Sequence, residues 1–247
     1  MISLVTGKIG SGKTLHSVGL ITSHIAKGGT VYTNVDLVWP ELVKWVRIHH
    51  RVIPEEAQLN RIDLVDDDSW HKLIAWGTAD LPVLVVLDEI HLFFNARDWQ
   101  KTQTLHRSML SFLSQSRKAC VDVVFIAQVA TTLEKQFRVQ CEWEFYCRNV
   151  KDIVIPIFGK LPFCFMLLVK KDVETDKAVE RRFISYDKSL FPVYDTRAFL
   201  DAEMRQAAES ANVVPPLKLR KVPLVPVRVR WAALAALVLT AAFVYFT

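Results

Sequence analysis

Short apolar runs alternate with amphipathic stretches over the first half of the chain. Runs that are apolar almost throughout, as strands covered on both faces require, lie at residues 2–6, 30–35, 81–89 and 121–128. Helical spacing of apolar positions is found at residues 13–27, 41–47, 69–76 and 102–117. Strands that alternate with helices in this way predict an α/β domain with a mainly parallel sheet.

The pattern changes after about residue 140. Shorter segments that alternate or run apolar are separated by Pro, Gly and Lys/Asp turns, which predicts antiparallel strands flanking the sheet. These segments are EWEFYCRNV, DIVIPIF, FCFMLLVKK and AVERRFISY. Residues 196–210 predict a helix with a thin apolar face, and the four prolines between positions 215 and 226 favour an extended strut. We therefore expect one domain over residues 1–195 and a linker over 196–230.

The last residues, 231–247 (WAALAALVLTAAFVYFT), contain neither a charge nor a proline. As a helix they would extend roughly 26 Å, slightly less than the bilayer core of about 30 Å. An apolar core helix is the alternative. The apolar character on every face, Trp231 and Tyr245 near the two boundaries, and the basic upstream flank favour a transmembrane helix instead. The positive-inside rule then places the preceding domain in the cytoplasm and the C-terminus across the membrane.

Charge and cysteine content narrow the classes further. The net charge is +5, and the acid-free segment 215–230 alone accounts for the excess, so the basic balance is local rather than a surface that coats nucleic acid. The four cysteines form no CxxC pair and no zinc-spaced cluster, which favours reduced thiols over a disulfide framework.

A phosphate-binding loop follows the first predicted strand. The motif G-x-x-x-x-G-K-[ST] lies between that strand and a predicted helix, the context in which glycine-rich backbone N–H groups surround phosphate oxygens. We expect Lys13 to reach the β- and γ-phosphates of ATP and the Thr14 hydroxyl to hold Mg²⁺. The expected nucleotide contacts are Gly7, Lys8, Ile9, Gly10, Ser11, Gly12, Lys13, Thr14 and Leu15.

An acidic motif ends the most apolar strand. Residues 84–89 (LVVLDE) predict that Asp88 contacts Mg²⁺ and that Glu89 polarises the attacking water. Acids at strand ends are common in α/β folds, so this motif gains its meaning from the P-loop. His91 follows directly, but no ligand set at zinc spacing accompanies it, and we expect no metal other than Mg²⁺.

Two further positions are candidates for catalysis. Gln128 ends the strand after the acidic one, where its side chain would sense the γ-phosphate, although a surface glutamine is an equally good interpretation. Arg117 closes the preceding helix and is our choice for an arginine supplied to a neighbouring subunit's site. The other basic candidates for that role are Arg107, Lys118, Arg138 and Arg148.

The order and spacing of these parts resemble the zonula occludens toxin family, whose phage members are the gene I assembly proteins of filamentous bacteriophages. The P-loop near the N-terminus, LVVLDEIH, the segment HRSMLSFLSQSRKACVDVVFIAQ and one membrane span after a proline-rich basic linker carry the resemblance. It implies a nucleotide-binding fold of the RecA/FtsK-like pumping ATPases. Lys13 and Thr14 match the phosphate loop, Asp88 and Glu89 the acidic motif, and Gln128 the glutamine after the next strand. Members of the family usually continue past the span into a periplasmic domain, and we expect the natural protein to continue in the same way.

The resemblance implies a membrane-anchored ATPase that powers assembly and export of filamentous phage through the host inner membrane. Expected partners are further copies of the chain in a homo-oligomeric ring, phage coat proteins or phage single-stranded DNA, and an outer-membrane secretin. A conjugation-type DNA translocase, a nucleotide-gated assembly scaffold with little turnover, and a host-targeting toxin are the alternatives.

Overall fold

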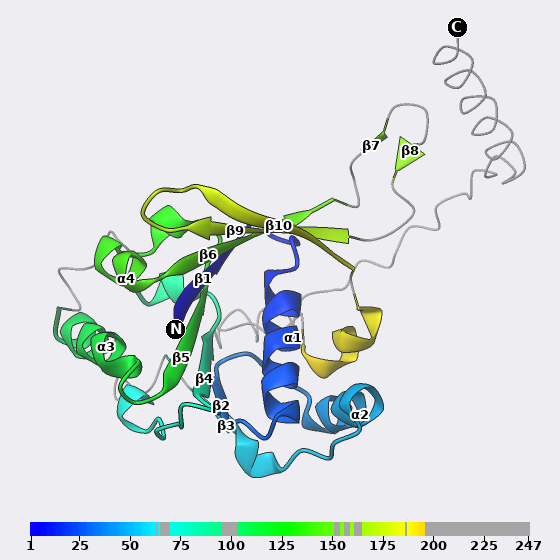
Figure 1. Ribbon diagram of the computed structural model, residues 1–247, viewed down its shortest axis with the longest axis horizontal. Helices are drawn as coiled ribbons and strands as arrows, with labels where there is room; N and C mark the ends of the chain where they lie inside the picture. The colour runs from blue at the N-terminus through cyan, green and yellow to red at the C-terminus, as the bar shows by residue number, and fades with distance from the viewer. Residues whose placement is uncertain are drawn as a thin grey trace, which may run out of the picture. The chain divides into compact units, whose positions relative to one another are not determined.

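A computed structural model of the chain describes residues 1–62, 64, 70–94, 103–150, 154–155, 159–160, 165–185 and 187–195 (Figure 1). The chain divides into two compact units. The first comprises residues 1–153 and 161–198, and the second residues 154–160 and 199–247. In the second unit the structure describes one antiparallel pair, β7 (Val154–Ile155) with β8 (Gly159–Lys160).

The first unit is built on one sheet of eight strands in the order β10-β9-β6-β1-β5-β4-β2-β3. From β6 to β3 all neighbours are parallel, whereas β9 is antiparallel to β6 and β10 to β9, with a bulge between Ala178 and Glu180. The predicted mainly parallel sheet with flanking antiparallel strands is therefore confirmed. The strands are β1 (Ile2–Thr6), β2 (Val31–Thr33), β3 (Leu59–Arg61), β4 (Val83–Leu87), β5 (Val121–Ile126), β6 (Trp143–Asn149), β9 (Phe165–Asp172) and β10 (Ala178–Ser185).

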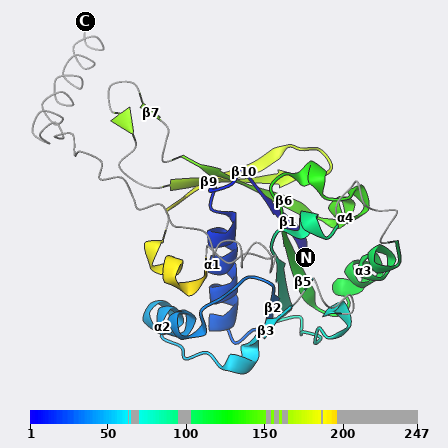
Figure 2. The same ribbon diagram turned by 180° about the vertical axis from the view of Figure 1, so that it is seen from behind.

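Helices cover both faces of the sheet (Figures 1 and 2). On one face, α1, α2 and η5 bury a core around Val5, Val86 and Ile126, and on the other, α3 and α4 bury a core around Leu4, Val85 and Phe125. The α-helices are α1 (Lys13–Ala26), α2 (Trp39–His50), α3 (Gln103–Ser116) and α4 (Lys135–Gln140). The 3-10 helices are η1 (Glu56–Gln58), η2 (Trp70–Lys72), η3 (Ile90–Leu92), η4 (Ala130–Thr132) and η5 (Lys188–Val193).

The helix α1 shows how the sequence pattern sets this packing. Leu15, Val18, Ile21 and Ile25 recur at helical spacing and are all buried against the sheet. The helix ends at a glycine because Gly28 has φ +88°. The N–H of Gly28 donates to the Ile25 carbonyl and that of Gly29 to the His24 carbonyl, which satisfies the last carbonyls of the helix.

One predicted helix is wrong, and one predicted strand is only partly as expected. The helix expected at 69–76 is only the short η2 within the described residues. Downstream N–H groups bond elsewhere, that of Ala75 to the Tyr32 hydroxyl and that of Gly77 to the Ala119 carbonyl, so the helix does not continue. The segment around β6 is antiparallel to β9, as expected, but it also pairs parallel with β1. The parallel pairing arises because α4 carries the chain back to the start of β1, where the Glu142 N–H donates to the Ile2 carbonyl.

Several predictions lie outside the described residues. The helix at 196–210, the linker to residue 230 and the transmembrane helix at 231–247 all belong to this group. Among the residues that the structure does describe, no helix combines the length and the apolar character needed to cross a membrane.

Candidate phosphate-binding and catalytic site

The loop between β1 and α1 packs closely against the end of β6. Gly7 has φ +147°, and a Cβ atom on it would lie 2.3 Å from the Cys147 carbonyl oxygen and 2.6 Å from the Ser11 Oγ atom. Gly10 has φ +73° but faces open space, and Gly12 has φ +96° at the start of α1. The glycines are therefore needed for different reasons: Gly7 for its close approach to β6, and Gly10 and Gly12 for their backbone conformation.

The Lys13 side chain lies within the curve of this loop. Its Nζ atom donates to the Gly7 carbonyl at 3.0 Å and to the Lys8 carbonyl at 3.3 Å, and the residue is only 7% exposed. A buried ammonium group that is held by neutral carbonyl oxygens alone retains most of its attraction for an anion. The loop thus combines a fixed cation with the N-terminus of α1.

Thr14 and Asp88 join the phosphate loop to the acidic motif. The Thr14 hydroxyl donates to Asp88 Oδ2 at 3.0 Å, although Thr14 comes after β1 and Asp88 comes after β4. Asn34, which follows β2, fixes the Asp88 backbone from the other side. Its Oδ1 atom accepts from the Asp88 N–H at 2.7 Å, and its Nδ2 atom donates to the Asp88 carbonyl at 2.9 Å.

Burial disfavours the charged form of Asp88. Desolvation, followed by the nearby Glu89 carboxylate, raises the pKa of Asp88 above its usual range. The Glu89 N–H, which donates to Asp88 Oδ1 at 2.8 Å, the Thr14 hydroxyl and the Lys13 charge act in the opposite direction. Burial, the largest of these influences, therefore outweighs the groups that favour the charged carboxylate.

Glu89 occupies a strained backbone position next to this carboxylate. Its φ is +49°, a region that non-glycine residues rarely adopt, and it is the N-cap residue directly before η3. The His91 Nδ1 atom lies 3.3 Å from Glu89 Oε2, and the His91 side chain is largely buried. Strain of this kind costs on the order of 1–3 kcal/mol and persists only where the surroundings impose it.

The end of β6 supports the loop from its other side. The Asn149 Nδ2 atom donates to the Gly10 carbonyl at 3.1 Å. Below it, the Thr6 hydroxyl at the end of β1 donates to the Glu144 carboxylate. The P-loop is therefore bonded to β6 at the same end where Gly7 packs against Cys147.

The remaining predicted residues divide into two groups. Gln128 lies two residues beyond the end of β5, and its carbonyl accepts from the Gly7 N–H at 3.2 Å, so the structure brings it to the loop. Arg117 is exposed in the turn before β5. In that turn the carbonyls of Ala119 and Cys120 accept from Gly77 and from Val83 at the start of β4, so the turn lies at the opposite edge of the parallel sheet from the P-loop.

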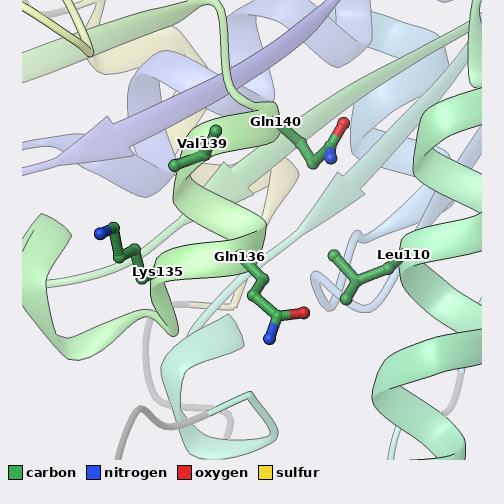
Figure 3. Close-up of a pocket in the computed structure, with 5 residues that line it drawn as sticks. All are labelled: Leu110, Lys135, Gln136, Val139 and Gln140. Carbon is green, nitrogen blue, oxygen red and sulfur yellow. The ribbon is translucent and has the colours of Figure 1, made fainter.

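The other basic candidates also differ in position. Arg148 is exposed on β6, one residue before Asn149, whereas the Arg138 guanidinium donates to the Ala130 carbonyl at 3.3 Å. Arg107 and Lys118 are exposed on or just after α3. A separate hollow between α3 and α4 contains none of the predicted site residues (Figure 3). Its lining residues are Leu110, Lys135, Gln136, Val139 and Gln140.

These residues fit a magnesium nucleotide. A glycine-rich loop, a buried ammonium and a helix N-terminus suit phosphate oxygens, and the paired Thr14 and Asp88 oxygens are the hard ligands that Mg²⁺ prefers. The strand order separates β1, which leads into the phosphate loop, from β4, which leads into the acidic turn, by β5 alone. The order of the strands and the phosphate loop together identify the fold of this chain as that of a P-loop NTPase.

Comparison with known proteins places the chain more narrowly. The sequence profile of the zonular occludens toxin (Zot) family matches residues 1–199, and the chain belongs to this family. Gene 1 protein of Escherichia phage If1 is 32% identical over 222 residues, which cover 81% of this chain and 60% of that protein. The chain thus spans about 60% of the length of the curated relatives it matches.

Two solved structures are similar to the chain. The N-terminal domain of zonular occludens toxin from Neisseria meningitidis is 18% identical with a TM-score of 0.48, covering 78% of this chain and 98% of that domain. The ATPase domain of G40P is 10% identical with a TM-score of 0.50, covering 76% of this chain and 82% of that domain. At this identity the second likeness shows a shared fold.

Asn34 and Asn149 are the polar residues of the site that sequence reasoning missed. Each follows or ends a parallel strand, and polar residues at the carboxyl ends of parallel strands mark the edge where ligands bind in open α/β sheets. For Asn34 that signal was present in TVYTNV, whereas for Asn149 it needs the parallel pairing of β6 with β1 that the structure shows.

The close approach of Gly7 to β6 predicts an asymmetry between two glycines of the loop. Gly7→Ala places a methyl group against the Cys147 backbone and should lower the free energy of unfolding by several kcal/mol, as overpacking does. Gly10→Ala meets open space and should cost only about 1–2 kcal/mol for its left-handed backbone. Urea unfolding of both variants measures the difference, and equal losses would contradict the packing of Gly7 on β6.

The raised pKa of Asp88 predicts how stability depends on pH. A carboxyl group whose pKa is raised in the folded state stabilises the fold at low pH, where it is protonated. That stabilisation is lost as the pH rises from the ordinary pKa of 3.8 through the raised pKa, so above this range the carboxylate destabilises the fold. In EDTA at pH 8, Asp88→Asn should therefore unfold at a higher temperature than the wild type, by about 2–4 °C per kcal/mol gained. The difference should shrink towards pH 4. A lower midpoint for the variant at pH 8 would show that the ionised carboxylate stabilises the fold.

Proposed function

We propose that the chain binds Mg-ATP at this loop and hydrolyses it. The observation that carries the proposal is the 3.0 Å hydrogen bond between Thr14 Oγ1 and Asp88 Oδ2, because it joins the two motifs into one site beside the buried Lys13 ammonium. Two side chains far apart in the sequence have this geometry only where the strand order places them together.

Each residue has a distinct part in the proposed reaction. Lys13 and the loop N–H groups bind and orient the phosphates, and Thr14 and Asp88 hold Mg²⁺, which would neutralise charge that develops on the phosphate oxygens. Glu89 accepts the proton of the attacking water, and Gln128 orients that water from the end of β5. Asn34 keeps the acidic turn in place by holding both backbone groups of Asp88.

We further propose that hydrolysis powers the assembly and export of a filamentous phage from the inner membrane, with residues 231–247 as the anchor. Membership of the Zot family and the similarity to a gene 1 protein of a phage support this assignment. The expected partners remain phage coat proteins or single-stranded DNA and an outer-membrane secretin.

The chain is proposed to act as a ring of identical subunits. Arg117 is exposed at the sheet edge opposite its own P-loop, so any action on phosphate would be at the site of a neighbour. Anchoring in one plane raises the effective concentration of subunits and favours a closed cyclic assembly.

Two variants separate binding from hydrolysis. Lys13→Ala should lose nucleotide binding, because the loop loses its buried cation, whereas Glu89→Gln should bind ATP normally and lose turnover by about 100-fold or more, because the base is removed and the metal ligands remain. A fluorescent ATP analogue reports affinity, and phosphate release reports turnover. Normal turnover in Glu89→Gln would refute the assignment of the base. Tight ATP binding without hydrolysis in the wild type would favour the nucleotide-gated scaffold.

An arginine acting between subunits predicts complementation. Lys13→Ala and Arg117→Ala should each be inactive alone, the first because its site is empty and the second because no subunit supplies the arginine. Mixed in equal amounts they should recover about a quarter of wild-type turnover, since an intact site then lies beside an intact arginine. Arg47→Ala, which changes an exposed arginine on α2 that is not a candidate for this role, serves as the control and should behave like the wild type. A mixture as inactive as its components would remove Arg117 from this role.

A further inference from the structure

Beyond β6, no helix in the described part of the first unit covers one face of the sheet. Cys147, Met166 and Leu168 pack into the core beneath α1, so the alternate residues of β6 and β9 lie on the opposite face. Ile184 likewise packs towards α1, which places Phe183 on that opposite face, where it is 70% exposed. Among the described helices of the first unit, none lies over β9 and β10 on this side (Figures 1 and 2).

Strand register arranges the side chains of this open face in two rows. Arg148 of β6 lies opposite Leu167 of β9, which lies opposite Phe183 of β10. In the next row Tyr146 lies opposite Val169, which lies opposite Arg181. Each flanking strand therefore carries one aromatic ring and one guanidinium group, with small apolar side chains between them. We call these six residues the β6–β10 platform.

The platform carries two exposed guanidinium groups. Arg148 and Arg181 are exposed, and neither forms an ion pair with any residue in the described part of the chain. Lys171 adds a third cation, 5.4 Å from the centre of the Tyr146 ring, although Asp176 lies 2.9 Å from its Nζ atom. The acid on this face of β6, Glu144, is bonded to the Thr6 hydroxyl.

We propose that the β6–β10 platform binds single-stranded DNA. Aromatic rings on an open sheet stack on unpaired bases, and cations beside them contact the phosphates that follow each base. A duplex cannot use the rings, because its bases are already stacked, so the pairing of ring with guanidinium favours a single strand. A protein partner would need an apolar centre larger than Leu167 and Val169 provide between two arginines.

The platform is joined to the phosphate loop through β6. Arg148 precedes Asn149, whose side chain holds the Gly10 carbonyl, and Cys147 between the two rows packs on Gly7. Movement of the loop is therefore transmitted directly to the strand that carries Tyr146 and Arg148. This inference rests on the proposed ATPase function only where it couples DNA binding to the phosphate loop, because DNA binding itself needs no nucleotide.

The test is fluorescence anisotropy of a labelled oligothymidine of about 20 nucleotides, titrated without nucleotide with the full chain in detergent. Phe183→Ala and Arg181→Ala should each weaken binding about tenfold, and Arg181→Ala should also reduce the slope of log K against log salt by about 0.7. Arg182→Ala is the matched control, since Arg182 is adjacent on β10, lies on the other face and pairs with Glu180. It should bind like the wild type.

Other outcomes overturn the proposal. Absence of oligothymidine binding by the wild type would do so, as would equal affinity for a duplex of the same length with no effect of Phe183→Ala. If Phe183→Ala and Arg181→Ala instead dissociate an oligomer in light scattering, the platform is a contact between copies of the chain. ATP turnover measured separately distinguishes these failures, since an inactive wild type that still binds the oligonucleotide refutes only the proposed hydrolysis.

Discussion

Parallel pairing brings the carboxyl ends of β1, β5 and β4 to one edge of the sheet, and the site exists because of it. Each strand ends in a different group there: β1 in the glycine loop, β5 near Gln128, and β4 in the acidic turn. The hydrogen bond from Thr14 to Asp88 connects the first and the last of these across the intervening strand. Any change of register would separate these two side chains, so the chemistry depends on pairing that is specified by the buried apolar strands.

The same edge of the sheet brings together groups that do not favour the stability of the fold. These groups are the largely buried Lys13 ammonium, the Asp88 carboxylate with its raised pKa, and Glu89 with its positive φ. Two asparagine side chains hold the backbone around them: Asn34 binds both backbone groups of Asp88, and Asn149 binds the carbonyl of Gly10. Amide side chains suit this purpose because they donate and accept without adding charge beside Asp88.

Much of this arrangement was predictable from the sequence, since the apolar runs identify β1, β4 and β5 and the glycine spacing identifies the loop. The direction of β6 was not predictable. It depends on α4, whose six residues are too short to display a helical period. The part played by Asn34 depends on the order of strands in space, because its partner lies 54 residues away. Arg117 shows that closeness in sequence does not give closeness in space. It precedes β5, whereas Gln128 follows β5, so Arg117 lies at the end of that strand far from its own site.

The sheet ends on β10, whose outer backbone groups pair with no strand in the described part of the chain. An open edge of eight residues is a template for adding a foreign strand and so for aggregation. The bulge between Ala178 and Glu180 interrupts the regular spacing of that edge, and the charged Glu180, Arg181 and Arg182 lie along it. These features discourage edge-to-edge growth into fibrils. The chain can thereby keep a long sheet without polymerising through its edge strand.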